Sequence, residues 1–461
     1  MSTEARRARA SASDRLPART IALYAIGSLG TGGYATLPGL VLTYFLTDNL
    51  GVSALVAGVI VIAAKIWDVV IDPVIGAASD RELARTGSRR GLMTVGALTL
   101  PVFFALTFAV PPSWGPGAGA VCVLLAFLAT ATAFSLFQVP YVALPAELTA
   151  GYDERTRLLG WRVVVLTASI LLFGAGGPAL RTLGGDPVTG YLVMGVAAGL
   201  AIGIGMLVAA RAATADDRAT AARRRTADGL GARPTTTLRA QYAAGVRVLR
   251  ESRPFRALLG TFLLQALATG TMLAGAQYVA TWVLRSEDAV TFVFVALVGP
   301  ALVAAPVWSA VARRTGKERA FAGASLLFTV AAASLIAAVW APGPWMYASI
   351  AVAGVAYAGL QSLPMAMLPD VISHDGGARA GAFTGVWTAG ETIGFALGAT
   401  VVSLTLAATG YVSTVAGTTA AQPDAAIAGI VLAFSVAPAA LMLASLVPLA
   451  RYRLRRSDID D

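Results

Sequence analysis

Long apolar runs, separated by short polar segments, dominate the pattern of residues along the chain. Each run is close to the length of about 20 residues that a helix needs to cross a bilayer. Because lipid offers no partner for free backbone groups, the interior of each run is predicted to be helical. Twelve such runs are expected, at residues 20–47, 53–80, 91–111, 118–147, 157–183, 187–210, 254–284, 288–312, 319–341, 345–369, 381–409 and 425–450.

A polar segment divides these runs into two groups of six. Its second part has apolar residues at helical spacing and arginines elsewhere, which predicts an amphipathic helix on the membrane surface. The second run of each group ends in a short basic loop, so the halves resemble each other weakly. The predicted organisation is a tail (1–19), a six-helix bundle (20–210), a central loop with the amphipathic helix (211–253), a second six-helix bundle (254–450) and a tail (451–461).

Composition supports an all-α membrane protein, because 57% of residues are hydrophobic and only 13% are charged. Soluble proteins carry about twice that share of charge. The net charge of +10 could suggest a nucleic-acid partner, but its placement argues against one. Of the 35 Lys and Arg residues, all but four lie in the tails and in alternate loops; the exceptions are Lys65, Arg162, Arg181 and Arg285. This positive-inside pattern predicts a multi-pass protein of the cell membrane with both termini in the cytoplasm.

Three charged residues interrupt the second apolar run, "KIWDVVIDPVIGAASDR". Lys65, Asp68 and Asp72 share one face of a helix at this spacing. An ionisable group in the bilayer costs a few kcal/mol or more, so it normally faces a partner or a water-filled path. The cluster is either a structural ion-pair group or a coupling-ion site. One cation cannot neutralise two carboxylates, and the surplus acid favours a site that holds a proton or a metal cation.

This stretch resembles the motif W-D-x-x-x-D-P-x-x-G-x-x-x-D-R of the glycoside–pentoside–hexuronide cation symporters. Further matches run along most of the chain, in "YAIGSLGTGGYATLPGLVLTYFLTDNLGVS", "SLFQVPYVALPAELT", "ERTRLLGWR", "RPF" and "GFALGATVVSLTLAATGY". The resemblance implies the major facilitator fold, with twelve transmembrane helices in two six-helix bundles. It implies a small-molecule solute as the partner, and a monomer is sufficient for this architecture.

The resemblance also implies roles for individual residues. Asp68 and Asp72 match the cation-binding carboxylates of the family, and Lys65 matches the basic residue one turn before them. Arg162 matches an arginine near the substrate. Ser135 stands where the family has a threonine, and its hydroxyl could serve the ion. A gating role at the cytoplasmic side is implied for three further residues of the motif, Gly76, Asp80 and Arg81.

The chain departs from the family at positions that determine the solute and the ion. Sugar-binding members carry acids where this chain has Gly32 and Gln138, which puts a galactoside-like site in doubt. Gln138 could still form hydrogen bonds with a polar solute. An asparagine that helps to bind sodium is replaced by Ile71. Because a hard cation such as sodium takes about six oxygens, this loss favours a proton over sodium.

Other candidates lie in or beside the apolar runs. Thr392 replaces a lysine common in the family, and Glu391 lies next to it. Glu391 has three possible roles: an ion pair with Lys65 or Arg162, a second protonatable group, or a binder of a cationic solute. Most mid-span aromatic residues are expected to serve packing. Those taken as candidates for lining the path are Tyr141, Trp161 and Trp387.

These features predict a secondary transporter that couples the symport of a small polar or amphipathic solute to a gradient of protons or, less favoured, of sodium. The alternative is a proton-driven exporter of an amphipathic, drug-like or lipid-like molecule. The sequence contains no phosphate-binding glycine loop, metal-ligand cluster or nucleophile triad, so neither ATP-driven transport, a cofactor nor a structural metal is expected. An embedded enzyme or receptor would need a catalytic cluster or a sensor domain, and neither is predicted.

Overall fold

The computed structural model describes residues 16–149, 152–214, 238–375, 380–418 and 420–452, together with residue 454. The other residues, which include most of both predicted tails and the first part of the predicted central loop, lie outside this described part. Eleven helical segments in it are long and apolar enough to span a membrane. They are Ala54–Thr86, Arg90–Phe108, Pro116–Pro145, Arg157–Gly184, Pro187–Ala213, Arg253–Val283, Ala289–Thr315, Lys317–Val339, Trp345–His374, Ala382–Ala408 and Asp424–Ala450.

Each of these segments coincides with a predicted apolar run, and only the first run differs. Residues 20–47 are helical but divided near Gly27, which separates α2 (Ala18–Ile26) from α3 (Ser28–Tyr44). A π-helical turn, η1 (Phe45–Asn49), follows α3. The twelve predicted runs are therefore represented by eleven candidate spans and one divided helix.

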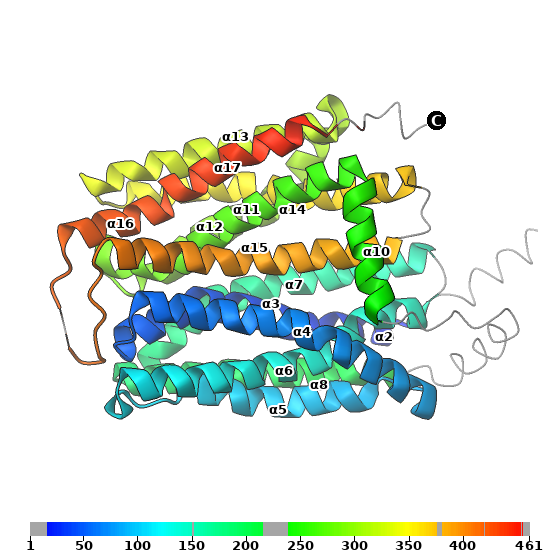
Figure 1. The fold of residues 1–461 in the computed structure, drawn as a ribbon, viewed down its shortest axis with the longest axis horizontal. Helices are drawn as coiled ribbons and strands as arrows, with labels where there is room; N and C mark the ends of the chain where they lie inside the picture. Colours follow the sequence, from blue (N-terminus) through cyan, green and yellow to red (C-terminus); the bar gives the residue numbers. More distant parts are fainter. Residues whose placement is uncertain are drawn as a thin grey trace, which may run out of the picture.

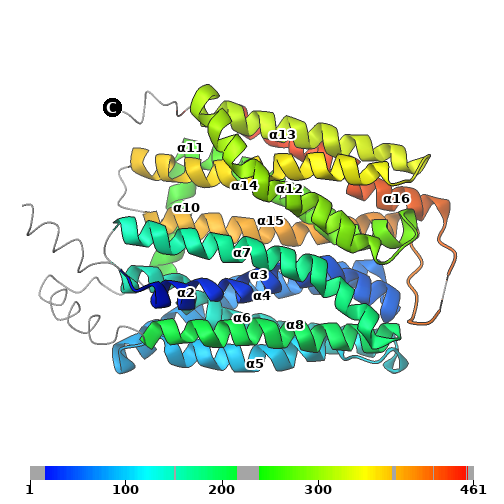
Figure 2. The same ribbon diagram turned by 180° about the vertical axis from the view of Figure 1, so that it is seen from behind.

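The helices form two halves that are stacked side by side in Figures 1 and 2. The first half contains α2, α3, α4 (Ala54–Thr86), α5 (Arg90–Phe108), α6 (Pro116–Leu148), α7 (Tyr152–Leu180) and α8 (Pro187–Ala210). The second contains α11 (Arg253–Tyr278), α12 (Ala289–Thr315), α13 (Lys317–Ser334), α14 (Trp345–His374), α15 (Ala380–Ala408), α16 (Asp424–Phe434) and α17 (Val436–Ala450). A π-helical turn, η5 (Val279–Val283), follows α11 as η1 follows α3. This shared irregularity supports the internal repeat.

The main helix pairs that join the halves are α4 with α15, α7 with α12, and α3 with α11, and α3 also contacts α15. Glycine permits the close approach of two of them. A Cβ atom on Gly58 of α4 would lie 2.7 Å from the Cβ atom of Ser403 on α15. A Cβ atom on Gly174 of α7 would overlap the ring of Phe294 on α12. Small residues at helix contacts are typical of membrane bundles, in which packing rather than hydrophobic burial drives association.

The two ends of the bundle differ. Helix α10 (Leu238–Glu251) crosses one end roughly perpendicular to the other helices, and Figure 1 shows it at the right, on the same side as the end of α17. It packs against α11 and α15, with Val248 buried and Arg247 and Arg250 exposed. This end is called the α10 end below. The opposite end, which carries η1 and the connection from α15 to α16, is called the Asp48 end.

Candidate functional site

The charged residues of α4 form the centre of the candidate site. The Nζ atom of Lys65 lies 3.0 Å from Oδ2 of Asp68, so these two residues form an ion pair. Asp68 is only 7% exposed. The Oδ1 atoms of Asp68 and Asp72 are both buried and have no hydrogen-bond partner among the described residues. The geometry therefore leaves one carboxylate without a cation and two buried oxygens with unused lone pairs.

Two neighbouring helices complete the surroundings of this group. Ser135 of α6 is close enough to Asp72 for its hydroxyl to interact with the carboxylate. Tyr34 of α3 lies on the other side, with its ring centre 5.2 Å from Nζ of Lys65. Its buried hydroxyl has no hydrogen-bond partner in the described part of the chain and is close enough to sense the charges of both aspartates. Tyr34 was not among the residues predicted from the sequence, although it is the one tyrosine in the glycine-rich stretch "GTGGYATLPG".

Arg162 of α7 forms a second polar group with residues of α2, α3 and α6. Its guanidinium carbon lies 5.4 Å from the ring centre of Tyr141. The Tyr141 hydroxyl donates a hydrogen bond of 2.9 Å to the carbonyl of Tyr24 and lies 3.3 Å from Oγ of Ser28. Ser28 also donates a hydrogen bond of 3.2 Å to the Arg162 carbonyl. These contacts hold the Tyr141 ring beside the guanidinium of Arg162. The buried Nε of Arg162 has no hydrogen-bond acceptor among the residues that the structure describes.

Gly32 and Gln138, at which the chain departs from the acids of the sugar-binding members that it resembles, have different surroundings. Oε1 of Gln138 accepts a hydrogen bond of 2.8 Å from Thr31, and Gln138 remains partly exposed. Gly32 is buried against α7, where a Cβ atom would lie 2.7 Å from Cβ of Ser169 and 3.2 Å from the carbonyl oxygen of Leu166. Gly32 therefore serves helix packing, and the chain has no room for an acid at this position.

Glu391 of α15 is partly buried on the opposite half of the molecule. It interacts electrostatically with Arg162 and with Tyr357 of α14, but no ion pair joins it to Arg162. Lys65, the other proposed partner, pairs with Asp68 instead. The first of the three roles considered for Glu391, a direct ion pair, is therefore absent from this structure.

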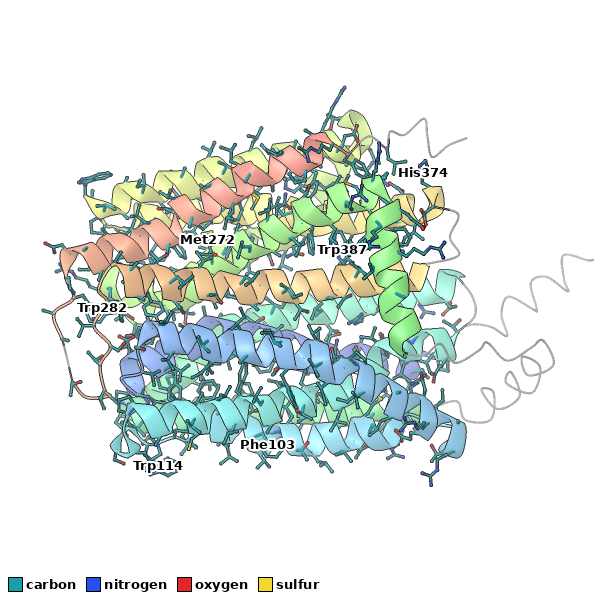
Figure 3. The ribbon with its side chains drawn as sticks, viewed as in Figure 1. Phe103, Trp114, Met272, Trp282, His374 and Trp387 are labelled. Atoms are coloured by element: carbon teal, nitrogen blue, oxygen red, sulfur yellow. The ribbon has the colours of Figure 1, made fainter. Side chains whose placement is uncertain are left out.

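The remaining candidates of the second half and α7 lie in different environments. Trp387 is 1% exposed and stacks on Phe262 at 4.2 Å between ring centres, so it packs inside the second half, where Figure 3 labels it. Thr392 is partly exposed, on the same face of α15 as Ser403, the residue against which α4 packs. Trp161 is 54% exposed, and no ring stacking or hydrogen bond with a described residue holds it beside Arg162.

The predicted gating motif lies at the α10 end, where an arginine that the sequence analysis missed organises it. The side chain of Arg89, which precedes α5, lies 2.7 Å from Asp80 and 2.6 Å from Glu147 at the end of α6. It also donates a hydrogen bond of 2.7 Å to Ser79. Burial alone would lower the pKa of Arg89, but its two carboxylate partners raise that pKa above its ordinary value. Arg81 is exposed, so the basic partner of the motif acid here is Arg89.

A corresponding ion pair lies in the second half. Lys317, at the start of α13, lies 2.5 Å from Asp370 near the end of α14 and donates a hydrogen bond of 3.0 Å to the carbonyl of Ala366. In each half, a cation at the start of the third helix therefore binds an acid near the end of the fourth. Gly76 of the first half is not required for close packing, since a Cβ atom there would make only an ordinary contact, at 3.7 Å, with Val139.

A third polar group closes the Asp48 end. Asp48 accepts hydrogen bonds from Thr47 at 2.6 Å and from Tyr411 of the second half at 2.5 Å. The hydroxyls of Thr47 and Tyr278 lie 2.7 Å apart. Backbone hydrogen bonds join the same segments, from Thr414 to Thr47 and from Ala416 to Asn49. Between pairs of described residues, the hydrogen bonds that join the two halves all lie toward this end.

Comparison with known proteins identifies the family of the chain and agrees with the fold. Residues 23–456 match the family of MFS/sugar transport proteins. An uncharacterized symporter of Synechocystis sp. is 26% identical over 542 aligned positions, which cover 96% of this chain and 95% of that protein. The inner membrane symporter YicJ of Escherichia coli is 24% identical and covers 90% of this chain and 86% of its own. A glucuronide carrier protein homolog of Escherichia coli is 29% identical over 30% of this chain and 31% of its own.

Solved structures show the same fold at low sequence identity. A nucleoside transporter, NupG, has a TM-score of 0.63 at 14% identity and covers 93% of this chain and 98% of its own. A bacterial homologue of the lysosomal transporter Spinster has a TM-score of 0.62 at 13% identity, over 94% and 95% of the two chains. The protein is a multi-pass membrane transporter and not an enzyme. By the match across nearly all of its length, the chain belongs to the family of MFS/sugar transport proteins.

Proposed function

We propose that this protein is a cation-coupled symporter that moves a small polar or amphipathic solute across the cell membrane by alternating access. The observation that carries the proposal is the pair of buried carboxylates on α4, Asp68 and Asp72, with a single cation beside them. The basic loops lie at the α10 end of the bundle. We therefore assign this end to the cytoplasm, together with both termini.

Coupling follows from the charge of this group. With Lys65 committed to Asp68, binding of a cation at Asp72 removes the net negative charge of the three residues. The neutral group is compatible with helix movement through a low-dielectric region, whereas an unpaired carboxylate is not. The ion site is on α4, which packs on α15 of the second half. Arg162, the proposed solute contact, is on α7, and α3 lies between α4 and α7. Ion and solute therefore act on the same two-state arrangement of the halves. By linkage, each ligand should then bind more tightly in the presence of the other.

A proton fits this site better than sodium does. The oxygen atoms available around Asp72 come from Asp68, Ser135 and Tyr34. Sodium would need about six oxygens, and the side chain of Ile71 contributes none. A proton needs only one of the unpartnered carboxylate oxygens, so a site of this kind favours proton coupling.

The relatives support symport but leave export open. The matched relatives from Synechocystis sp. and Escherichia coli are named as symporters. A shorter match, 27% identical over 39% of this chain, is named as a putative 2,3-dihydroxypropane-1-sulfonate exporter of Salmonella typhimurium. A proton-driven exporter of an amphipathic, drug-like or lipid-like molecule is therefore the second candidate, since the same carboxylates could drive antiport.

The test is proton flux in proteoliposomes that contain wild type, Asp72→Asn or Asp424→Asn. Asp424 is an exposed acid at the start of α16 and serves as the matched control. Sugars, sugar acids, lysolipids and hydrophobic drugs are supplied in sodium or in potassium medium. Solute-driven proton entry that is lost in Asp72→Asn and is independent of sodium supports the proposal. Proton exit during solute entry supports antiport instead, and full coupling in Asp72→Asn contradicts both.

A further inference from the structure

We propose that Glu391 binds a positively charged group of the solute, so that the substrate class is a polar molecule with a cationic nitrogen. This inference rests on the proposed transport function and specifies its solute. The charge lies on the second half of the molecule, opposite the arginine on the first half. A solute that bridges the halves can therefore present a cationic group to α15 while its polar remainder faces α3, α6 and α7.

The position of Glu391 within its helix sets it apart from other acids of the second half. The remaining acids in the described spans of this half are Glu318, Asp370 and Asp424. Each of those lies within five residues of a helix end, and Asp370 is already paired with Lys317. Glu391 lies about a dozen residues into α15, so no loop can supply it with a cation.

Among the described residues, no cation forms an ion pair with Glu391. Arg162 is near enough to interact electrostatically with Glu391. The guanidinium of Arg162 lies over the ring of Tyr141, however, and forms no ion pair with Glu391. The two residues lie on α7 and α15, in halves that move relative to each other in alternating access. A permanent pair would hold the halves together, whereas separate charges remain available to a solute.

The neighbours of Glu391 suit a cationic nitrogen. Tyr357 of α14 interacts with Glu391, and its hydroxyl accepts a hydrogen bond of 2.7 Å from Nε2 of Gln361. Its ring supplies the kind of electron-rich face on which ammonium groups bind. The opposite half does not provide the acids that accept sugar hydroxyls, because Gly32 is packed against α7 and Gln138 already accepts a hydrogen bond from Thr31. The charged recognition groups are thus Arg162 and Glu391.

The experiment measures binding of matched cationic and neutral solutes to the detergent-purified full chain. Glucosamine is paired with glucose, and choline with its neutral isostere 3,3-dimethylbutanol. The half-saturating concentration is taken from solute-dependent thermal stabilisation of wild type, Glu391→Gln and the control Asp424→Asn. In wild type, at least one cationic solute should bind about tenfold or more tightly than its neutral partner. Glu391→Gln should remove that preference, and Asp424→Asn should retain it.

Two results overturn the inference. The first is equal binding, or no detectable binding, of both members of each pair by wild type. The second is an unchanged cationic preference in Glu391→Gln. If that variant instead alters the number of protons moved per solute while the preference is kept, Glu391 is a second protonatable group and not a solute site. Because the binding measurement requires no ion gradient, it is independent of the Asp72→Asn flux result, and either proposal can fail alone.

Discussion

Tyr411 donates a hydrogen bond of 2.5 Å to the carboxylate of Asp48, although the two residues are 363 positions apart. Nε1 of Trp282 donates a second hydrogen bond, of 2.7 Å, to the Tyr411 hydroxyl. Asp48 belongs to the first half, whereas Tyr411 and Trp282 belong to the second. These hydrogen bonds join the halves at the Asp48 end and are called the latch below. In the proposed alternating-access cycle, the latch has to break when that end opens.

Replacement of Tyr411 by Phe should weaken this latch. Because burial raises the pKa of Asp48 to about 7, the value for an ordinary hydrogen bond, about 0.5–1.5 kcal/mol, applies. Loss of this bond should raise the population open at the Asp48 end by about two- to tenfold. The backbone amides of Thr414 and Ala416, which donate across the halves, report on this opening through hydrogen exchange. Their exchange should be faster in Tyr411→Phe.

The matched control for this prediction is Tyr347→Phe, because Tyr347 carries the same phenol group, packs against Phe292 and forms no side-chain hydrogen bond with a described residue. It should leave the exchange of the same two amides unchanged. Equal exchange in wild type and Tyr411→Phe would mean that the backbone pairing of residues 414–416 with residues 47–49 closes this end without help from the side chain.

The sequence was sufficient to predict eleven of the twelve expected spans, because lipid forces apolar runs of this length to be helical, but it did not predict the division of the first run near Gly27. It also predicted the grouping of Lys65, Asp68 and Asp72, since residues three and four apart on a helix share a face. These features depend on one segment at a time. The identity of the family followed from the same stretch, in which the order of residues is specific.

Contacts between helices could not be predicted from the sequence in this way. Tyr34, Arg89 and Tyr411 each bind residues that are distant in the sequence, and helical periodicity does not state which helices are neighbours. Their types gave only weak signals: a tyrosine among glycines, one arginine of a basic pair, and a tyrosine after a span. The candidate role of Trp387 shows the reverse problem, since a mid-span aromatic can equally pack inside one half, as it does here.

Gly32 supplies a prediction about packing. A Cβ atom there would press on Ser169 and on the backbone of α7, so Gly32→Ala should lower the free energy of unfolding by about 1–3 kcal/mol. Gly176, further along α7, is the control, because a Cβ atom on it would meet no described atom within 4 Å. Gly176→Ala should leave stability unchanged or raise it by up to about 1 kcal/mol, because alanine favours the helix.

Denaturant titration of both detergent-solubilised variants measures the difference. Equal stability of Gly32→Ala and Gly176→Ala would show that α3 and α7 can separate at no cost. In that case the absence of an acid at position 32 would need an explanation other than space.

The ion pairs of Arg89 lead to the last prediction. The side chain of Arg89 is 10% exposed and holds together α4, α5 and α6 through Asp80, Glu147 and Ser79. Removal of the Arg89 side chain deprives Glu147, which is largely buried, of its cation. For a fully buried pair such a loss costs about 3–5 kcal/mol. Asp80 is mostly exposed and can be solvated, so Arg89→Ala should lower the free energy of unfolding by about 2–3 kcal/mol.

The control is the adjacent, exposed Arg90, because Arg90→Ala should change the free energy of unfolding by less than about 0.5 kcal/mol. Because these partners of Arg89 belong to the first half, Arg89→Ala should not accelerate exchange at the amides of Thr414 and Ala416. Faster exchange there would instead place Arg89 in the coupling between the two ends of the bundle.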